Sequence, residues 1–237
     1  MRIIDHCLCC GSDQLIQTDV LWQRLIDDWR LAPAETVYIN RQQGFHCPRC
    51  GTNLRAMALA AAVMRAYRYS GLFQDFVVSK RACELRVLEI NQAGLLTQFL
   101  TRIEGHTLVA YPEIDMQALP YADGSWDLVI HSDTLEHVPN PVRGLAECAR
   151  VLAPDGICAF TVPMIVDRLT LSRAGMPPSY HGDASMANPD YLVQTEFGCD
   201  VWKFIMAVGF AECRVVSLAY PAAQAFLGIR DEGKPVE

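Results

Sequence analysis

LPYADGSWDLVIHSDTLEHVPNPVRGLAECARVLAPDGICAFTVP, residues 119–163, reads as a strand, a loop, a helix, a turn and a second strand. Residues 127–132 form a short apolar run rich in branched side chains, as in strands buried on both faces. Asn140 and Pro141 predict the N-cap and the first turn of a helix, which a Pro-Asp-Gly turn ends. Residues 157–162 supply the next apolar strand. Two parallel strands joined by a crossover helix predict a doubly wound α/β sheet, whose ligands lie beyond the carboxyl ends of its strands.

The composition is that of a globular chain of 237 residues, enough for one α/β domain and a small additional module. Hydrophobic residues make up 51% and charged residues 20%, which excludes the disordered and fibrous classes. No apolar run approaches the ~18 residues of a membrane span, and the first residues lack the apolar core of a signal peptide. We therefore expect a cytoplasmic protein with no membrane partner. The net charge of −7 argues against a nucleic-acid partner, although a local basic patch stays open.

Two cysteine pairs share a spacing and a following glycine. Cys7 and Cys10 precede Gly-Ser, and Cys47 and Cys50 precede Gly-Thr. A CxxCG turn points two thiolates and several backbone N–H groups at one ion, and four thiolates suit tetrahedral zinc. The chain has ten cysteines in all, so the alternatives are reduced structural thiols or a chance repeat of the spacing. We predict a structural zinc at these four residues, since four thiolates leave no open coordination position.

The chain divides into two regions. Residues 1–52 are predicted to form a zinc-ribbon-like N-terminal module that closes around a helix at 20–31. Residues 53–237 then form the α/β domain, beginning with an alanine-rich helix at 53–70. A segment at about 164–194 loses sheet periodicity and is rich in turn residues, so we expect a lid over the site. A helix and a late strand follow it.

Three blocks, LPYADGSWDLV, LEHVPNP and RVLAPDGICAFTVP, occur in this order and resemble the second half of the class I S-adenosylmethionine-dependent methyltransferase domain. The similarity lies with the branch that contains many small-molecule methylases and covers roughly residues 85–219. It implies a Rossmann-like sheet of seven strands whose last strand runs antiparallel, with residues 53–237 as the methyltransferase domain. It also implies S-adenosylmethionine as cofactor and a small-molecule or carrier-bound substrate.

The loop after the first strand, residues 85–90, corresponds to the family's cofactor loop. The family pattern is an acid followed by glycines at alternating positions; here the acid is Glu89, and Asn91 and Ala93 replace two glycines before Gly94. Asn tolerates left-handed backbone angles and Ala is the smallest side chain after Gly, so the turn can survive. The resemblance implies that Glu89 holds the cofactor's amino group, directly or through water. The absence of a GxGxxG fingerprint argues against a nicotinamide-dependent enzyme.

Further cofactor contacts are expected after the second and fourth strands. The usual acid for the ribose hydroxyls is not evident, and Glu113 is the only nearby carboxylate; a ribose contact and a solvated loop acid are equally supported. Asp115 and Met116 match the family's next block, in which the acid accepts from the adenine amino group and the following residue frames the ring. We also assign His131, near the end of the fourth strand, to the cofactor site.

Chemistry is expected where the fourth strand ends. Methyl transfer from a sulfonium is an in-line displacement, for which an enzyme supplies alignment and, for a poor nucleophile, a base. Asp133, Glu136 and His137 follow this strand and share one face if they are helical. Their spacing resembles the metal-binding motif of ubiquinone-pathway O-methyltransferases and of small-RNA 3′-terminal 2′-O-methyltransferases, with Asp in place of Glu. A second divalent metal at these three residues is therefore one hypothesis, and capping of the helix is the other.

His181 lies in the sequence PPSYHG of the predicted lid. A histidine on such a loop is a general-base candidate because its pKa suits proton removal near neutrality; a hydrogen-bonded loop histidine is the alternative. We assign His181, Asp133 and His137 as the catalytic candidates.

The function predicted from these residues is methyl transfer from S-adenosylmethionine to O or N of a small or carrier-bound substrate. One alternative is a non-catalytic methyltransferase-fold binding protein, in which the altered glycine loop no longer holds cofactor. Another is an RNA methyltransferase that grips RNA with its zinc module. The substrate, the acceptor atom and the oligomeric state are left open by the sequence.

Overall fold

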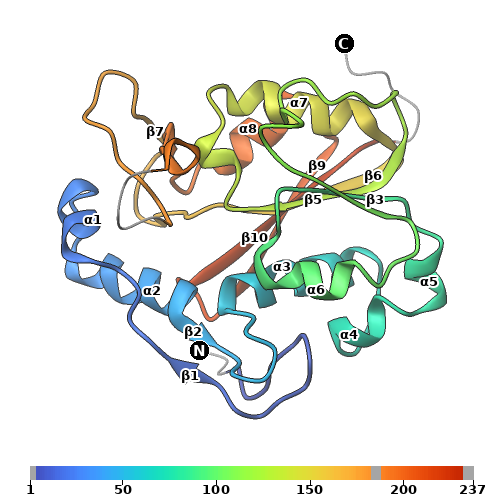
Figure 1. Ribbon diagram of the computed structural model, residues 1–237, viewed down its shortest axis with the longest axis horizontal. Coiled ribbons are helices and arrows are strands. Elements are labelled where there is room, and N and C mark those ends of the chain that lie inside the picture. The colour runs from blue at the N-terminus through green and yellow to red at the C-terminus, as the bar shows by residue number, and fades with distance from the viewer. Residues whose placement is uncertain (1–3, 183–187, 232–237) are drawn as a thin grey trace.

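The computed structural model describes residues 4–182 and 188–231 (Figure 1). Its centre is a sheet of six strands: β3 (Val87–Ile90), β4 (His106–Val109), β5 (Trp126–Ser132), β6 (Leu152–Thr161), β9 (Glu212–Leu218) and β10 (Ala223–Ile229). The strand order is β4-β3-β5-β6-β10-β9. The first four strands run parallel, whereas β10 pairs antiparallel with both β6 and β9. The predicted Rossmann-like α/β sheet and its antiparallel last strand are confirmed.

Helices cover both faces of this sheet (Figure 1). One face carries α3 (Leu54–Ala66), α4 (Phe73–Phe76), α5 (Lys80–Cys83) and α6 (Thr97–Leu100), and the other carries α7 (Pro141–Val151) and α8 (Val201–Ala207). Two starts follow the sequence signals: Oδ1 of Asn53 accepts from the Ala56 N–H at α3, and Oδ1 of Asn140 accepts from the Arg143 N–H at α7. Among the described residues the longest helix, α3, has 13 residues, so none is long enough to cross a membrane.

The sheet has one strand fewer than the seven expected. Residues 110–125, between β4 and β5, run through successive turns and form no edge strand. The side chains of α7 satisfy the backbone of this connection instead. Glu147 accepts from the Leu119 N–H at 2.8 Å, and Arg150 donates to the carbonyl oxygens of Leu119 and Tyr121 at 2.9 and 2.8 Å. Because these backbone groups are already paired, the segment needs no neighbouring strand.

The N-terminal region packs beside the lower helical layer of Figure 1. It contains a two-stranded antiparallel sheet of β1 (Ile16–Gln17) and β2 (Phe45–His46), and between them α1 (Gln23–Asp28) and α2 (Pro33–Gly44). The predicted helix at 20–31 is present as the shorter α1. The second helix, α2, was not predicted, although its sequence carries two start signals: proline at the first position, and Glu35, whose Oε2 accepts from the Ala32 N–H.

The predicted lid is described except for residues 183–187, which lie outside the described residues. It contains β7 (Leu171–Ser172) and η3 (Pro189–Tyr191), and β7 pairs antiparallel with β8 (Thr195–Glu196). Two contacts, one between backbone groups and one from a side chain to the backbone, hold its end against η2 (Leu135–His137), the turn that follows β5. The Gln194 N–H donates to the Glu136 carbonyl at 2.7 Å, and Nδ1 of His137 lies 3.0 Å from the Leu192 carbonyl oxygen. The described part of this segment therefore lies over the carboxyl end of the sheet.

Candidate functional site

Asn91 joins the three loops that follow β3, β4 and β5. Its backbone is left-handed, with φ of 54°, as expected where the family has glycine. The Asn91 N–H donates to the Val109 carbonyl at 2.7 Å, and its side-chain Oδ1 accepts from the Tyr111 N–H at 3.0 Å. Its Nδ2 lies 3.4 Å from Oγ1 of Thr134. The substitution of glycine therefore preserves the turn and ties it to the neighbouring strand ends.

The Glu89 carboxylate holds this loop by hydrogen bonds. Its side chain is fully buried, and Oε1 accepts from the Ala93 N–H at 2.7 Å. Oε2 lies 2.7 Å from Nε2 of His106. The protein's own groups engage both carboxylate oxygens of Glu89. This geometry favours a structural role, in which Glu89 holds the loop, rather than the expected contact with the cofactor's amino group.

Open space adjoins the loop at η1 (Gly94–Leu96). Ala93 is buried, whereas a Cβ built on Gly94 would meet no atom within 4 Å. Gly94 has φ of 57°, a conformation that disfavours other side chains. The backbone here is thus exposed to a ligand that approaches the carboxyl ends of β3 and β5.

The residues expected to contact adenine and ribose occupy the connection after β4. Glu113 and Asp115 are exposed, and Oδ1 of Asp115 accepts from the Gln117 N–H at 2.8 Å. Met116 is instead buried in the core, and its sulfur lies 3.3 Å from a Cβ built on Gly144 of α7. The expectation that the Met116 side chain frames the adenine ring is therefore corrected. The Met116 backbone lies in the connection after β4.

His131 does not reach the cofactor site. Its side chain is fully buried on the α7 face of β5 and stacks on Phe160 with ring centroids 4.9 Å apart. Cys148 and Cys158 lie beside it. The assignment of His131 to cofactor binding was wrong, because alternation along β5 turns this side chain into the core.

Asp133 is the first residue after β5 and pairs with Arg55 of α3. Its backbone is left-handed, with φ of 47°. Burial raises the pKa of the Asp133 carboxyl, while the positive charge of Arg55 opposes that rise. Asp133 therefore serves as the partly buried counter-ion of Arg55, a pairing that the sequence did not predict because 78 positions separate the two.

Glu136, His137 and His181 come together at the end of β5. Nδ1 of His181 lies 3.2 Å from Oε1 of Glu136, and Nε2 of His137 lies 3.6 Å from the same oxygen. The two imidazole rings are 6.2 Å apart and nearly parallel. The prediction that the lid brings His181 to this turn is confirmed. The expected metal set of Asp133, Glu136 and His137 is corrected, because Arg55 holds Asp133 and His181 takes its place beside Glu136.

The charges in this cluster reinforce one another. Burial alone would lower the pKa of His181, but the hydrogen bond to Glu136 and the nearby carboxylates outweigh it, so the pKa is raised. Burial would raise the pKa of Glu136, but the two histidines outweigh it and the pKa is lowered. The Oε2 atom of Glu136 is buried and has no partner among the described residues.

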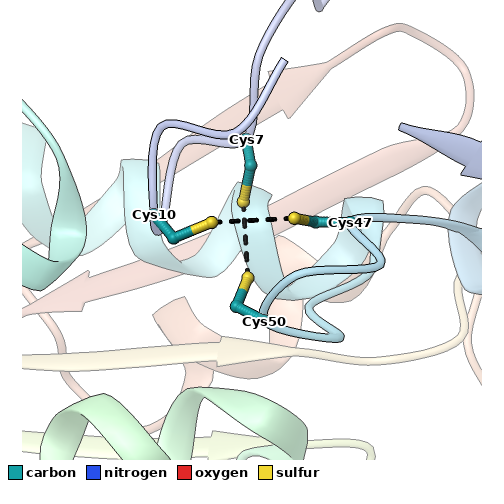
Figure 2. Close-up of side chains that lie close together, drawn as sticks. All are labelled: Cys7, Cys10, Cys47 and Cys50. Atoms are coloured by element: carbon teal, nitrogen blue, oxygen red, sulfur yellow. Dashed lines mark hydrogen bonds between the residues drawn. The ribbon is translucent and has the colours of Figure 1, made fainter. Parts of the chain in front are cut away.

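The four predicted cysteines converge on one point, as Figure 2 shows. The Sγ atoms of Cys7 and Cys50 are 3.6 Å apart, as are those of Cys10 and Cys47. Zinc–sulfur bonds of about 2.3 Å in a regular tetrahedron separate the sulfurs by about 3.8 Å, so the spacing fits that ion. Both turns have the same backbone: the residue 11 and residue 51 N–H groups donate to the carbonyls of Cys7 and Cys47 at 2.8 and 2.7 Å.

This cysteine cluster touches the cofactor loop. Nε2 of Gln98, in α6, donates to the Cys50 carbonyl at 2.9 Å. A Cβ on Gly51 would lie 2.4 Å from a methyl carbon of Leu95, so the second cysteine turn sits directly against η1. The turn around Cys7 is held to α4 by the Leu8 carbonyl, which accepts from the Phe73 N–H. The cluster is therefore part of the support of the loop that carries Gly94.

Comparison with known proteins identifies the central part of the chain. Residues 70–160 match the sequence model of a family described as Methyltransferase domain. A ubiquinone biosynthesis O-methyltransferase from Alkalilimnicola ehrlichii is 31% identical over 118 residues, which are 49% of this chain and 43% of that protein. A glycine/sarcosine/dimethylglycine N-methyltransferase from Actinopolyspora halophila is 34% identical over 94 residues, which are 34% of this chain and 17% of that protein. The match thus spans less than half the length of either relative.

Among solved structures, a protein from Thermotoga maritima described as a methyltransferase and possible histamine N-methyltransferase aligns with a TM-score of 0.43 at 14% identity. The alignment covers 88% of this chain and 97% of that one.

Proposed function

Since this chain belongs to the class I S-adenosylmethionine-dependent methyltransferase family, we propose that it methylates O or N of a small or carrier-bound substrate. The observation that carries the proposal is the contact between Asn91 and Thr134. It places the open cofactor loop next to the turn that holds Glu136 and His137. The O- and N-methyltransferases among the relatives support both acceptor atoms.

The residues present fit the cofactor. Asn91 and Gly94 keep the left-handed backbone that the loop requires, and the space at Gly94 admits a ligand. Asp115 would accept from the adenine amino group, and Glu113 is exposed where a ribose contact is needed. Bound S-adenosylmethionine supplies an electrophilic methyl group, and the protein's task is to align the acceptor and take its proton.

His181 is the proposed general base. With Nδ1–H donating to Glu136, its Nε2 carries the lone pair that accepts the substrate proton. Glu136 orients the ring and stabilises the imidazolium, because its own pKa is lowered and it stays ionised. His137 donates to the Leu192 carbonyl and keeps the lid in place, and Asp133 holds Arg55.

A divalent cation in this cluster is a second candidate. Ligand atoms of Glu136, His137 and His181 lie within 4.8 Å of one another, and Glu136 has one oxygen without a partner. A chelator distinguishes the two candidates, provided that zinc content is followed in parallel. Loss of turnover at unchanged zinc content, restored by added Mg²⁺ or Mn²⁺, would favour the cation over the base.

A structural zinc at Cys7, Cys10, Cys47 and Cys50 completes the proposal. Four thiolates close the coordination sphere, so the ion holds the N-terminal region and carries no chemistry. Reduced thiols are the form that binds metal, and they persist in the cytoplasm, where we place the protein.

Transfer of a labelled methyl group tests the function. Purified protein is incubated with methyl-deuterated S-adenosylmethionine and a panel of phenols, amines and metabolite extracts, and products are read by mass. We expect a labelled product in at least one fraction, and product formation about 10²-fold slower or more with His181→Ala. A protein that binds cofactor but labels nothing in any fraction would support the non-catalytic alternative.

A further inference from the structure

A cavity of about 270 Å³ lies between the N-terminal region and the lid. The segment between the two cysteine pairs builds most of its wall, and the lid closes one end. The residues that define it are Trp22, Leu25, Trp29, Ile39, Pro163 and His181. The proposed general base, His181, therefore lines the cavity, although most of the cavity wall comes from a region outside the sheet.

The wall offers almost no polar group to a ligand. Trp29 is buried, and its indole N–H already donates to Oγ of Ser179 at 2.9 Å, so the ring presents only its apolar surface. Among the described residues that line the cavity, His181 alone can carry a charge. A charged ligand would lose its hydration here without gaining a partner, which selects a neutral and apolar body.

Gln43 is the exception. It lines the cavity from α2, and its Nε2 is buried without a hydrogen-bond partner among the described residues. A buried amide N–H without a partner destabilises the protein, so a ligand oxygen that accepts from it would bind favourably. Trp22 and Trp29 add two indole rings, which pack well against a flat aromatic ring.

We propose that this cavity holds the methyl acceptor and that the acceptor is a neutral aromatic hydroxyl compound of one or two rings. The inference rests on the proposed function, because it takes His181 as the base. The ring lies among Trp22, Leu25 and Trp29, and Gln43 donates to an oxygen on it. The hydroxyl proton passes to His181 as the oxygen bonds the methyl carbon, and the cofactor sulfur keeps the electron pair of the broken bond.

The cysteine cluster closes the loop that builds the cavity. Both cavity helices, α1 and α2, belong to the loop that the cysteine pairs close. Arg168, in the lid, fixes that loop, since it donates to the Trp29 carbonyl at 2.7 Å and to Oε1 of Glu35 at 2.8 Å. The acceptor pocket is thus an insertion held by the proposed zinc at one end and by an ion pair at the other.

Two probes with the same ring system test the ligand class: 2-naphthol, which is neutral, and 2-naphthalenesulfonate, which is charged. Binding to the full-length protein is measured by calorimetry and by saturation-transfer NMR. We expect 2-naphthol to bind at least about 10-fold more tightly than the sulfonate. Leu25→Asp should weaken 2-naphthol about 10-fold or more, whereas Val37→Asp, an exposed position on α2, should leave it unchanged.

Gln43→Leu keeps the test decisive if Leu25→Asp fails to fold. This variant should weaken 2-naphthol but leave naphthalene, which has no oxygen, as tightly bound as in the wild type. Equal binding of both charged and neutral probes, or 2-naphthol binding untouched by both cavity variants, would overturn the inference.

Calorimetry with S-adenosylhomocysteine on the same preparations separates the two claims. If S-adenosylhomocysteine binds while the probes do not discriminate, the acceptor class is wrong and the proposed function stands. If the probes discriminate but S-adenosylhomocysteine does not bind, the cavity is supported as an aromatic-ligand site and the proposed function fails.

Discussion

Nδ1 of His181 lies 3.2 Å from Oε1 of Glu136, although 45 positions of the chain separate the two residues. Glu136 is fully buried and His181 is partly buried, and the pair joins the lid to the turn that follows β5. A carboxylate that holds one ring nitrogen leaves the other free to accept a proton, so this contact connects the fold with the proposed chemistry.

Loss of the imidazole should slow turnover strongly and leave cofactor binding nearly intact. We expect His181→Ala to lower kcat about 10²-fold or more, the usual effect of removing a general base. Affinity for S-adenosylhomocysteine should stay close to that of the wild type. Leu169→Ala is the control, since Leu169 lies in the same segment and is 66% exposed. Wild-type turnover in His181→Ala would contradict the role of His181 as the general base.

The cysteine cluster should bind one zinc per chain. Elemental analysis of protein purified without added zinc checks the stoichiometry, and Cys50→Ser should lower both zinc content and the melting temperature. Because Gln98 donates to the Cys50 carbonyl, the same variant should also weaken S-adenosylhomocysteine binding. Cys83→Ser, at an exposed cysteine outside the cluster, should change none of these. A wild type that folds fully without metal would contradict the prediction.

The ion pair of Glu35 and Arg168 should make the N-terminal region sensitive to acid. Burial opposes the charged form of Glu35, but the hydrogen bond from Arg168 outweighs it, so the pKa of Glu35 is lowered in the folded protein. Its stabilisation is therefore complete above the unfolded pKa of about 4.3 and is lost as the pH falls through the lower folded pKa.

Glu35→Gln should cost about 1–3 kcal/mol at pH 7, a drop of several degrees in Tm. Thermal unfolding at pH 7 and at pH 3 should show the gap between variant and wild type closing at the lower pH. Glu212→Gln, which removes an exposed pair with Arg214, should change Tm little at either pH. A Tm difference between Glu35→Gln and the wild type that grows at pH 3 would contradict the lowered pKa of Glu35.

The sequence predicted the elements whose signals are local. Asn140 and Pro141 mark the start of α7, and the apolar run at 127–132 became β5, because caps and periodicity act over a few residues. Asn91 took the left-handed backbone expected of a glycine substitute. The four cysteines met because repeated spacing with a following glycine specifies one turn twice.

Features set by distant contacts escaped prediction. Alternation along β5 determines on which face of the sheet the His131 side chain lies. The apolar run does not indicate which of the two faces adjoins the ligand. The pairing of Asp133 with Arg55 and the missing edge strand both depend on side chains from other elements. Most of the cavity wall comes from the segment that contains α1 and α2, so only the folded chain brings Trp29 to His181.

The central claim is that the loop at Gly94 binds S-adenosylmethionine, and calorimetric titration with S-adenosylhomocysteine tests it most directly. Gly94→Val strains a left-handed residue and fills the open space, whereas Gly175→Val imposes the same kind of strain at φ of 79° in the lid, also with nothing within 4 Å. The account predicts one site per chain in the wild type, at least about 10-fold weaker binding in Gly94→Val, and unchanged affinity in Gly175→Val. No detectable heat at millimolar ligand in the wild type, or equal binding by both variants, would contradict it.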